Sequence, residues 1–152
     1  MKKLLLLMLT LAYCFSGVSA ISAKSWVKTE DKKMNCSQVL IKNSKAQITL
    51  EDGSKFLIPL AQINSYSIEG KVFTRLNLYQ DGKPSGRKVF MQLLSTREDY
   101  CLYRYYRQDA EAPYYCYYIY KDGELSYSLD ESMASSRIKN LFQYFGFTAV
   151  FA

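Results

Sequence analysis

Short runs of alternating apolar and polar residues cover most of this chain. Alternation with a period of two residues is typical of strands that bury one face. Several such runs are clear: "SQVLIK" (37–42), "AQITLE" (46–51), "RKVFMQLLS" (87–95) and "GELSYSL" (123–129). Since no helical pattern separates them, they predict an antiparallel meander.

Turn residues divide these runs. Asp-Gly pairs at Asp52, Asp81 and Asp122, and a Glu69-Gly70 pair, predict hairpin turns, because glycine accepts the positive φ that tight turns need. The stretch 80–86, "QDGKPSG", is dense in turn residues and predicts the start of a longer connection.

A single helix is predicted near the end of the chain, over residues 134–145. Its apolar residues fall at helical spacing on one face: Ala134, Ile138, Leu141, Phe142 and Phe145. Gly146 stands where a left-handed residue ends a helix, and the apolar tail after it predicts a last short strand. The predicted fold is therefore mainly β, a single antiparallel meander sheet of about seven to nine strands, curved or partly barrelled. One C-terminal amphipathic α-helix packs on this sheet.

The first twenty residues predict a secretory signal peptide, 1–20. Two lysines precede an apolar core that is too short to span a bilayer, and small residues lead to a cleavage site after Ala20. Lipoprotein anchoring at Cys14 is a less favoured alternative, because Tyr13 occupies the place of the small residue before a lipidated cysteine. Residues 21–35 follow as a polar leader or a loosely docked first strand, and 36–152 form a single β-rich domain.

Composition supports export and excludes several chemistries. Removing Lys2 and Lys3 with the signal leaves 18 basic residues against 14 acidic ones, a diffuse net charge of about +4. Such a charge argues against nucleic acid as a partner, and no later segment predicts a transmembrane span. The chain has no histidine, which excludes Ser-His and Cys-His nucleophiles and histidine metal sites. No cofactor or metal site is predicted.

Residues 99–120, "DYCLYRYYRQDAEAPYYCYYIY", hold nine of the 14 tyrosines. One interpretation is structural: one face lies in the core and the other forms cross-strand aromatic ladders. The other is an exposed platform that stacks sugar rings or grips a protein, with arginine adding cation–π capacity. The candidate ligand-binding residues are Tyr100, Tyr103, Tyr105, Tyr115, Tyr117 and Arg104.

This stretch is predicted to fold as a hairpin with its turn in 108–111. That register places Cys101 opposite Cys116 and Tyr103 opposite Tyr114. Since exported proteins meet an oxidising compartment, we predict a disulfide between Cys101 and Cys116, with Cys36 left as a free thiol. A slip of one residue would send the two cysteines to opposite faces.

Adjacent carboxylates raise a third hypothesis, a glycoside hydrolase, which needs two carboxyl groups about 5–10 Å apart across a cleft. The pairs are Glu30-Asp31, Glu51-Asp52, Glu98-Asp99 and Asp130-Glu131. Neighbours on one strand point to opposite faces, and most of these pairs stand at turns, so we expect no enzyme.

Several stretches resemble a loose group of exported Bacteroidetes proteins of unknown function: "ITLEDGSKFLIPLAQINSYSIEGKVF", "LYRYY", "YYIYKDGELSYSL" and "RIKNLFQYF". The resemblance implies a β-rich envelope or secreted domain of a Gram-negative bacterium, and it brings no catalytic residues. We therefore expect an exported, non-enzymatic domain with a binding or structural role in the envelope. It would act in the periplasm, on the outer membrane surface or after secretion, with a glycan or an envelope protein as partner. The alternative is a carbohydrate-binding module using exposed tyrosines.

Overall fold

The structure is a computed structural model that describes residues 24–80, 82–108, 113–130 and 135–147. The predicted signal peptide, Cys14 and residues 148–152 of the tail 146–152, where a last strand is predicted, lie outside these residues. Eleven strands precede a short C-terminal helix, with one 3-10 turn among them. In chain order these are β1 (Ser25–Thr29), β2 (Lys33–Cys36), β3 (Gln38–Lys42), β4 (Lys45–Thr49), β5 (Lys55–Pro59), η2 (Leu60–Gln62), β6 (Ile63–Ile68), β7 (Lys71–Gln80), β8 (Lys83–Arg97), β9 (Tyr100–Arg107), β10 (Tyr114–Lys121), β11 (Glu124–Asp130) and α2 (Ser135–Tyr144).

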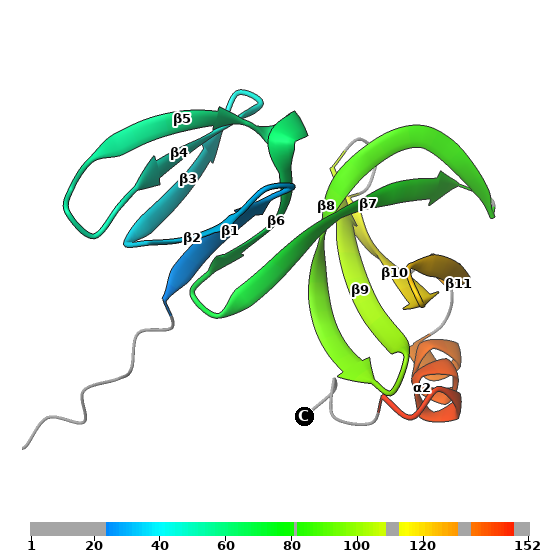
Figure 1. Cartoon of the computed structure of the whole chain (residues 1–152). Helices are drawn as coiled ribbons and strands as arrows, with labels where there is room; N and C mark the ends of the chain where they lie inside the picture. Colours follow the sequence, from blue (N-terminus) through cyan, green and yellow to red (C-terminus); the bar gives the residue numbers. More distant parts are fainter. Residues whose placement is uncertain (1–23, 81, 109–112, 131–134, 148–152) are drawn as a thin grey trace, which may run out of the picture.

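The strands form two antiparallel sheets, which confirms the mainly-β prediction. The larger sheet has eight strands in the order β11-β10-β9-β8-β7-β6-β1-β2, and β3, β4 and β5 form a separate sheet of three. From β6 to β11 the larger sheet is the predicted meander. Figure 1 shows two lobes, a first made by the three-stranded sheet with β1, β2 and β6, and a second made by β9, β10, β11 and α2. The strands β7 and β8 join them.

Several strand pairs are joined by two-residue turns with positive φ, as the turn residues predict. Asn43 and Ser44 join β3 to β4 at φ 48° and 62°, and Asp122 and Gly123 join β10 to β11 at φ 50° and 84°. The predicted long connection over 80–86 is wrong, because Gln80 already pairs with Lys83 across a tight turn. Its proline and second glycine lie inside the first residues of β8.

Part of the predicted polar leader is strand. β1 pairs with β2 on one side and with β6 on the other, so residues from Ser25 onward belong to the larger sheet. Val27 is fully buried there, together with Ile48 of the three-stranded sheet and Ile63. β1 is docked by the burial of Val27, by the half-buried Trp26 and by its pairing with β2 and β6.

The larger sheet has two differently covered faces. We call one the helix face: it packs against the three-stranded sheet at one end, through Val27 and Tyr66, and against α2 at the other, through Leu102 and Ile119. We call the opposite one the inner face, because β7 and β8 arch over it and the sheet curls around its side chains (Figure 1).

Hydrogen bonds from tyrosines hold this curl. The hydroxyl of Tyr118 donates to the carbonyl of Tyr79 at 3.1 Å, and that of Tyr120 donates to the carbonyl of Asn77 at 2.9 Å. Both bonds join β10 to β7, although two other strands lie between them in the sheet order. The sheet is therefore strongly curved, but it does not close into a barrel.

The helix α2 matches the prediction within a residue or two; Ala134 lies outside the described residues. Ile138 and Phe142 are buried against the helix face. Gly146 ends the helix at φ 76°, where its N–H donates to Gln143 and that of Phe147 donates to Phe142. These two hydrogen bonds together form a Schellman cap, which satisfies backbone carbonyls that a helix end would leave without donors. The guanidinium of Arg97 packs against Gly146 in the space that a side chain would occupy.

Candidate functional site

The tyrosine-rich hairpin pairs in a register different from the predicted one. Cys116 lies opposite Tyr105 rather than Cys101, and Cys101 lies opposite Tyr120. β9 continues to Arg107 and β10 begins at Tyr114, so the turn is centred later than the predicted 108–111. The predicted register is wrong by four residues. Because four is even, every side chain still lies on its predicted face.

The predicted disulfide is absent for the same reason. Neither Cys101 nor Cys116 forms a disulfide, and Cys36 forms none either. An offset of four residues along a strand is about 13 Å, and a disulfide needs Cα atoms within about 7 Å. Cys101 and Cys116 instead pack in the apolar cluster of the inner face.

Two predicted ligand-binding tyrosines are buried. Tyr103 is 8% exposed on the inner face, and Tyr117 is 9% exposed on the helix face. The ring of Tyr117 packs edge-on against Phe142 of α2 at 5.3 Å. Both residues serve the core, so a ligand at the surface does not reach them.

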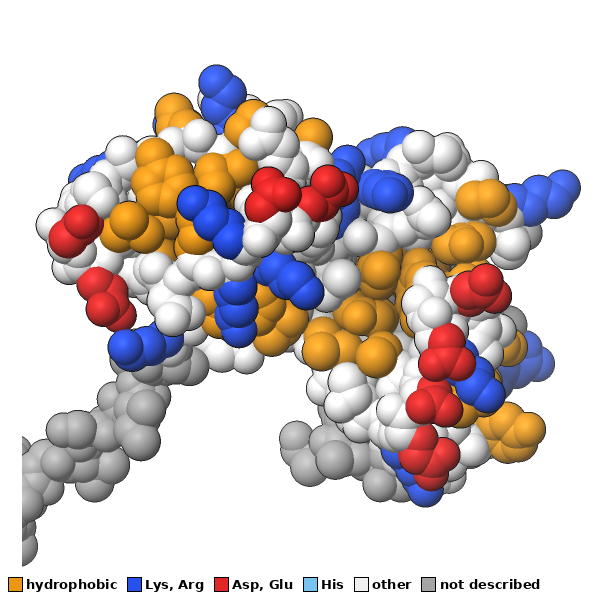
Figure 2. All heavy atoms as spheres, viewed as in Figure 1, with side chains coloured by type: hydrophobic (Ala, Val, Ile, Leu, Met, Phe, Trp, Pro, Cys, Tyr) orange, Lys and Arg blue, Asp and Glu red, His pale blue; other side chains and the backbone are white. Residues whose placement is uncertain are grey.

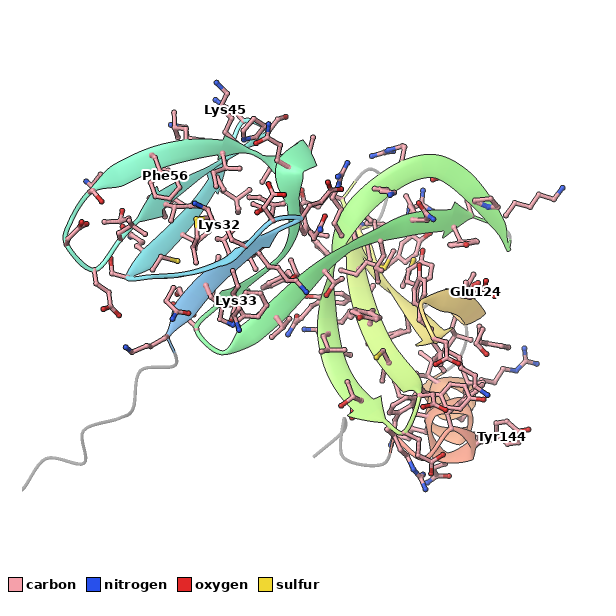
Figure 3. All side chains as sticks on the ribbon, viewed as in Figure 1. Lys32, Lys33, Lys45, Phe56, Glu124 and Tyr144 are labelled. Carbon is pink, nitrogen blue, oxygen red and sulfur yellow. The ribbon has the colours of Figure 1, made fainter. Side chains whose placement is uncertain are left out.

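Tyr100 stands apart from the other candidates. It lies at the far end of β9, where its ring packs edge-on against Phe145 at 5.3 Å and lies 5.3 Å from the ammonium group of Lys121. A shallow hollow of about 300 Å³ beside it is lined by Arg97, Glu98 and Tyr144. Figure 3 shows Tyr144 pointing away from α2 into solvent.

The structure brings Tyr115 and Arg104 together in one groove on the helix face, between the part covered by the three-stranded sheet and the part covered by α2. Tyr105 borders this groove through its place in β9, but its side chain lies on the inner face, where it packs in the apolar cluster. The volume of the groove is about 270 Å³. The groove also contains residues that were not predicted as ligand-binding: Phe73, Phe90, Gln92, Tyr106 and Gln108. Figure 2 shows hydrophobic side chains gathered over β8 and β9, where the lobes meet.

Two tyrosines form the exposed wall of the groove. Tyr106 and Tyr115 lie opposite each other on β9 and β10, with ring centroids 4.8 Å apart and planes tilted by 45°. They are 41% and 36% exposed. In the predicted register Tyr106 and Tyr115 do not lie opposite each other, so the prediction did not include this pair.

Arg104 lies beside this wall, between Tyr115 and Gln92. Its guanidinium carbon is 4.5 Å from the ring centroid of Tyr115, a cation–π contact. Its Nη2 donates to Oε1 of Gln92 at 3.0 Å. Its Nε is buried and has no hydrogen-bond acceptor among the described residues.

Aromatic rings also connect the groove to the core of the first lobe. Tyr66 stacks on Phe73 at 4.9 Å and meets Phe90 edge-on at 5.0 Å. Phe73 and Phe90 line the groove from their exposed side. Since Tyr66 is buried in the core, these two rings are held in place before any ligand arrives.

Two other hollows lie on the first lobe. One of about 410 Å³ is lined by Glu30, Asp31 and Lys32 from the bend after β1, and by Phe56 of β5. Figure 3 shows Lys32 and Phe56 on this side of the lobe. The other, of about 440 Å³, lies on the outer surface of the three-stranded sheet beside Leu40 and Leu57. Neither has a buried polar side chain among its lining residues.

Among the described residues, no three Cys, Asp or Glu side chains gather where they could hold a metal ion. No described helix is long and apolar enough to cross a membrane. No family of known proteins, no curated protein and no solved structure matches the chain. The groove around Arg104 is therefore the best basis for a functional proposal.

Proposed function

We propose that the protein is an exported, non-enzymatic domain that binds a glycan in the groove. The observation that carries this proposal is the pair of exposed rings, Tyr106 and Tyr115, beside Arg104 in one concavity. Tyrosine rings offer an apolar surface for the C–H face of a sugar, while their hydroxyls stay in contact with water. Gln92 and Gln108 add amide donors and acceptors, which orient a polar ligand in a mostly apolar pocket.

The size of the groove fits a small ligand unit. Pockets for drug-sized molecules measure about 300–1,000 Å³, and the groove has about 270 Å³. One sugar ring of a longer chain fills such a space. The remaining rings would run along the exposed wall of Tyr106 and Tyr115.

A hydrolase is supported less well. No carboxylate of the described residues lines the groove, whereas a glycosidase needs two of them flanking the scissile bond. Glu30 and Asp31 line a different hollow, but both come from one bend of the chain rather than from opposite walls. Export is supported by the signal pattern of residues 1–20 alone.

The test is a binding titration of the purified protein with a panel of short oligosaccharides, followed by NMR of the tyrosine rings. We expect Tyr115→Ala to weaken binding about tenfold, equivalent to about 1.4 kcal/mol, because it removes a stacking surface. The matched control is Tyr144→Ala, which removes an equally aromatic but 85% exposed side chain far from the groove. Equal loss in both variants, or no binding to any sugar of the panel, would contradict the proposal.

A further inference from the structure

Charge is distributed unevenly over the sheet that carries the groove. The four strands β7, β8, β9 and β10 contain no acidic residue. They contain nine basic ones: Lys71, Arg75, Lys83, Arg87, Lys88, Arg97, Arg104, Arg107 and Lys121. The described acidic residues next to these strands stand in the turns, at Glu69, Glu98, Asp99 and Asp122, and on the neighbouring strand β11, at Glu124 and Asp130. The surface of these strands therefore attracts anions.

Within the groove, Arg104 is the one charged residue among the described lining residues. Both contacts described above are with neutral groups, the amide of Gln92 and the ring of Tyr115. The ion pair between Lys24 and Glu51 lies on the first lobe, remote from Arg104 in sequence. Among the described residues, no carboxylate lies beside the guanidinium of Arg104.

Such an arrangement is costly without a ligand. A half-buried cation loses part of its hydration, and neutral partners replace that loss incompletely. A ligand carboxylate in the groove would supply the missing negative charge. Guanidinium groups bind carboxylates with two parallel hydrogen bonds, which gives geometric selectivity as well as attraction.

From these observations we propose that the groove selects acidic sugars, with the ring of a uronic acid against Tyr106 and Tyr115 and its carboxylate on Arg104. This inference rests on the proposed function, because it names the class of glycan that the groove takes. Arg75 lies on the helix face of β7 and would attract a further acidic unit of a polyuronate chain.

The experiment compares a trimer of galacturonic acid with a trimer of galactose, which has the same ring framework without the carboxylates. We expect the acidic trimer to bind the purified protein at least tenfold more tightly at low salt. Because exposed charges are screened by salt, this preference should shrink as ionic strength rises.

Substitutions at Arg104 then test whether this residue causes the preference for the acidic trimer. Arg104→Gln should remove it while the galactose trimer still binds, and Arg104→Lys should retain part of it, because lysine keeps the charge but not the planar fork. Lys88→Gln is the matched control: it removes one exposed charge from the same face without touching the groove lining, and it should leave most of the preference in place. Circular dichroism and the thermal midpoint confirm that each variant is folded.

The outcomes separate the two proposals. Equal binding of both trimers overturns the acidic-sugar inference and leaves the glycan-binding function standing. Binding of neither trimer, with binding to an acidic peptide instead, overturns both. A sulfated galactose trimer that binds more tightly than the galacturonic acid trimer would overturn the assignment of a carboxylate. If Lys88→Gln and Arg104→Gln reduce the preference for the acidic trimer equally, the preference comes from diffuse charge, and the role of Arg104 is overturned.

Discussion

The two faces of the β9–β10 hairpin carry the same residue type and use it in opposite ways. On the inner face, Tyr118 and Tyr120 are buried, and their hydroxyls hydrogen-bond to the backbone of a distant strand. On the helix face, Tyr106 and Tyr115 remain exposed between the two covered ends of the sheet. What a tyrosine does here is decided by what covers its face, since the local sequence on both sides is similar.

The largest expected contrast is between truncating a tyrosine on each face. Tyr120→Ala should reduce the free energy of unfolding by about 3–5 kcal/mol, because it leaves a cavity and an unpaired carbonyl at Asn77. Tyr106→Ala should cost below about 1 kcal/mol, because its side chain is 41% exposed. Urea unfolding of both variants measures the difference. Similar losses would show that the exposed wall is part of the core after all.

A helix-cap substitution probes how α2 keeps Tyr117 covered while Tyr115 stays exposed. Gly146→Ala should destabilise by about 1–2 kcal/mol, because an alanine at φ 76° is strained and its Cβ would meet the guanidinium of Arg97. Thermal unfolding measures the loss. The double variant Gly146→Ala/Arg97→Ala separates the two causes. It should relieve the clash with the guanidinium, but the backbone strain at position 146 should remain. Full recovery in the double variant would contradict a backbone contribution.

Removing only a hydroxyl isolates the curl of the sheet from the packing of the rings. Tyr118→Phe and Tyr120→Phe should each cost about 1 kcal/mol, because each leaves the β7 carbonyl without its donor. Tyr127→Phe is the matched control, since Tyr127 is exposed on β11. Chemical denaturation should show the loss in the first two variants alone. An equal effect of Tyr127→Phe would contradict the role of these bonds.

The two faces should also differ in their response to alkaline pH. Burial raises the pKa of Tyr118 and of Tyr120 above the ordinary tyrosine value of 10.0. Because the folded pKa exceeds the unfolded one, their contribution to stability is complete below pH 10 and is lost as the pH rises above it. Absorbance of tyrosinate should therefore show that Tyr118 and Tyr120 ionise together with unfolding. The double variant Tyr118→Phe/Tyr120→Phe should lose less stability over this range, and an unchanged slope would contradict the assignment.

The smallest effect concerns the thiols. Since Cys101 and Cys116 form no disulfide and are offset along the strands, a reducing agent should leave the urea midpoint unchanged. Alkylation of the unfolded, unreduced protein, followed by mass spectrometry, should label Cys36, Cys101 and Cys116. A missing pair of labels would restore the disulfide and require a different hairpin register.

Local signals in the sequence predicted much of this fold. The Glu69-Gly70 and Asp122-Gly123 pairs mark their turns, because both positions require positive φ. The apolar spacing of Ile138 and Phe142 predicted α2 and its buried face. These features depend on neighbours in the chain, so the sequence alone is sufficient for them.

Features set by distant contacts escaped prediction. The connection at 108–113 has no glycine to mark the turn, and the hairpin register was misplaced in consequence. The curvature of the sheet was predicted, but the separate three-stranded sheet and the hydrogen bond of Tyr118 to β7 depend on packing between segments remote in sequence. The groove was only half recognised for the same reason, since Phe73 and Phe90 reach Tyr115 through the fold and not along the chain.

The alternation of the two faces has a consequence for how the β9–β10 connection can vary in evolution. Where a change in its length is passed into the strands, gain or loss of two residues slides the hairpin but keeps each tyrosine on its own face. Gain or loss of one residue would instead exchange the faces, sending the groove arginine toward the interior and the hydroxyls that hold the curl toward solvent. Where the change is passed into the strands, homologous chains should therefore differ by an even number of residues. An odd change would need a β-bulge to absorb it, such as the one in the pairing of β8 with β9 between Leu93 and Ser95.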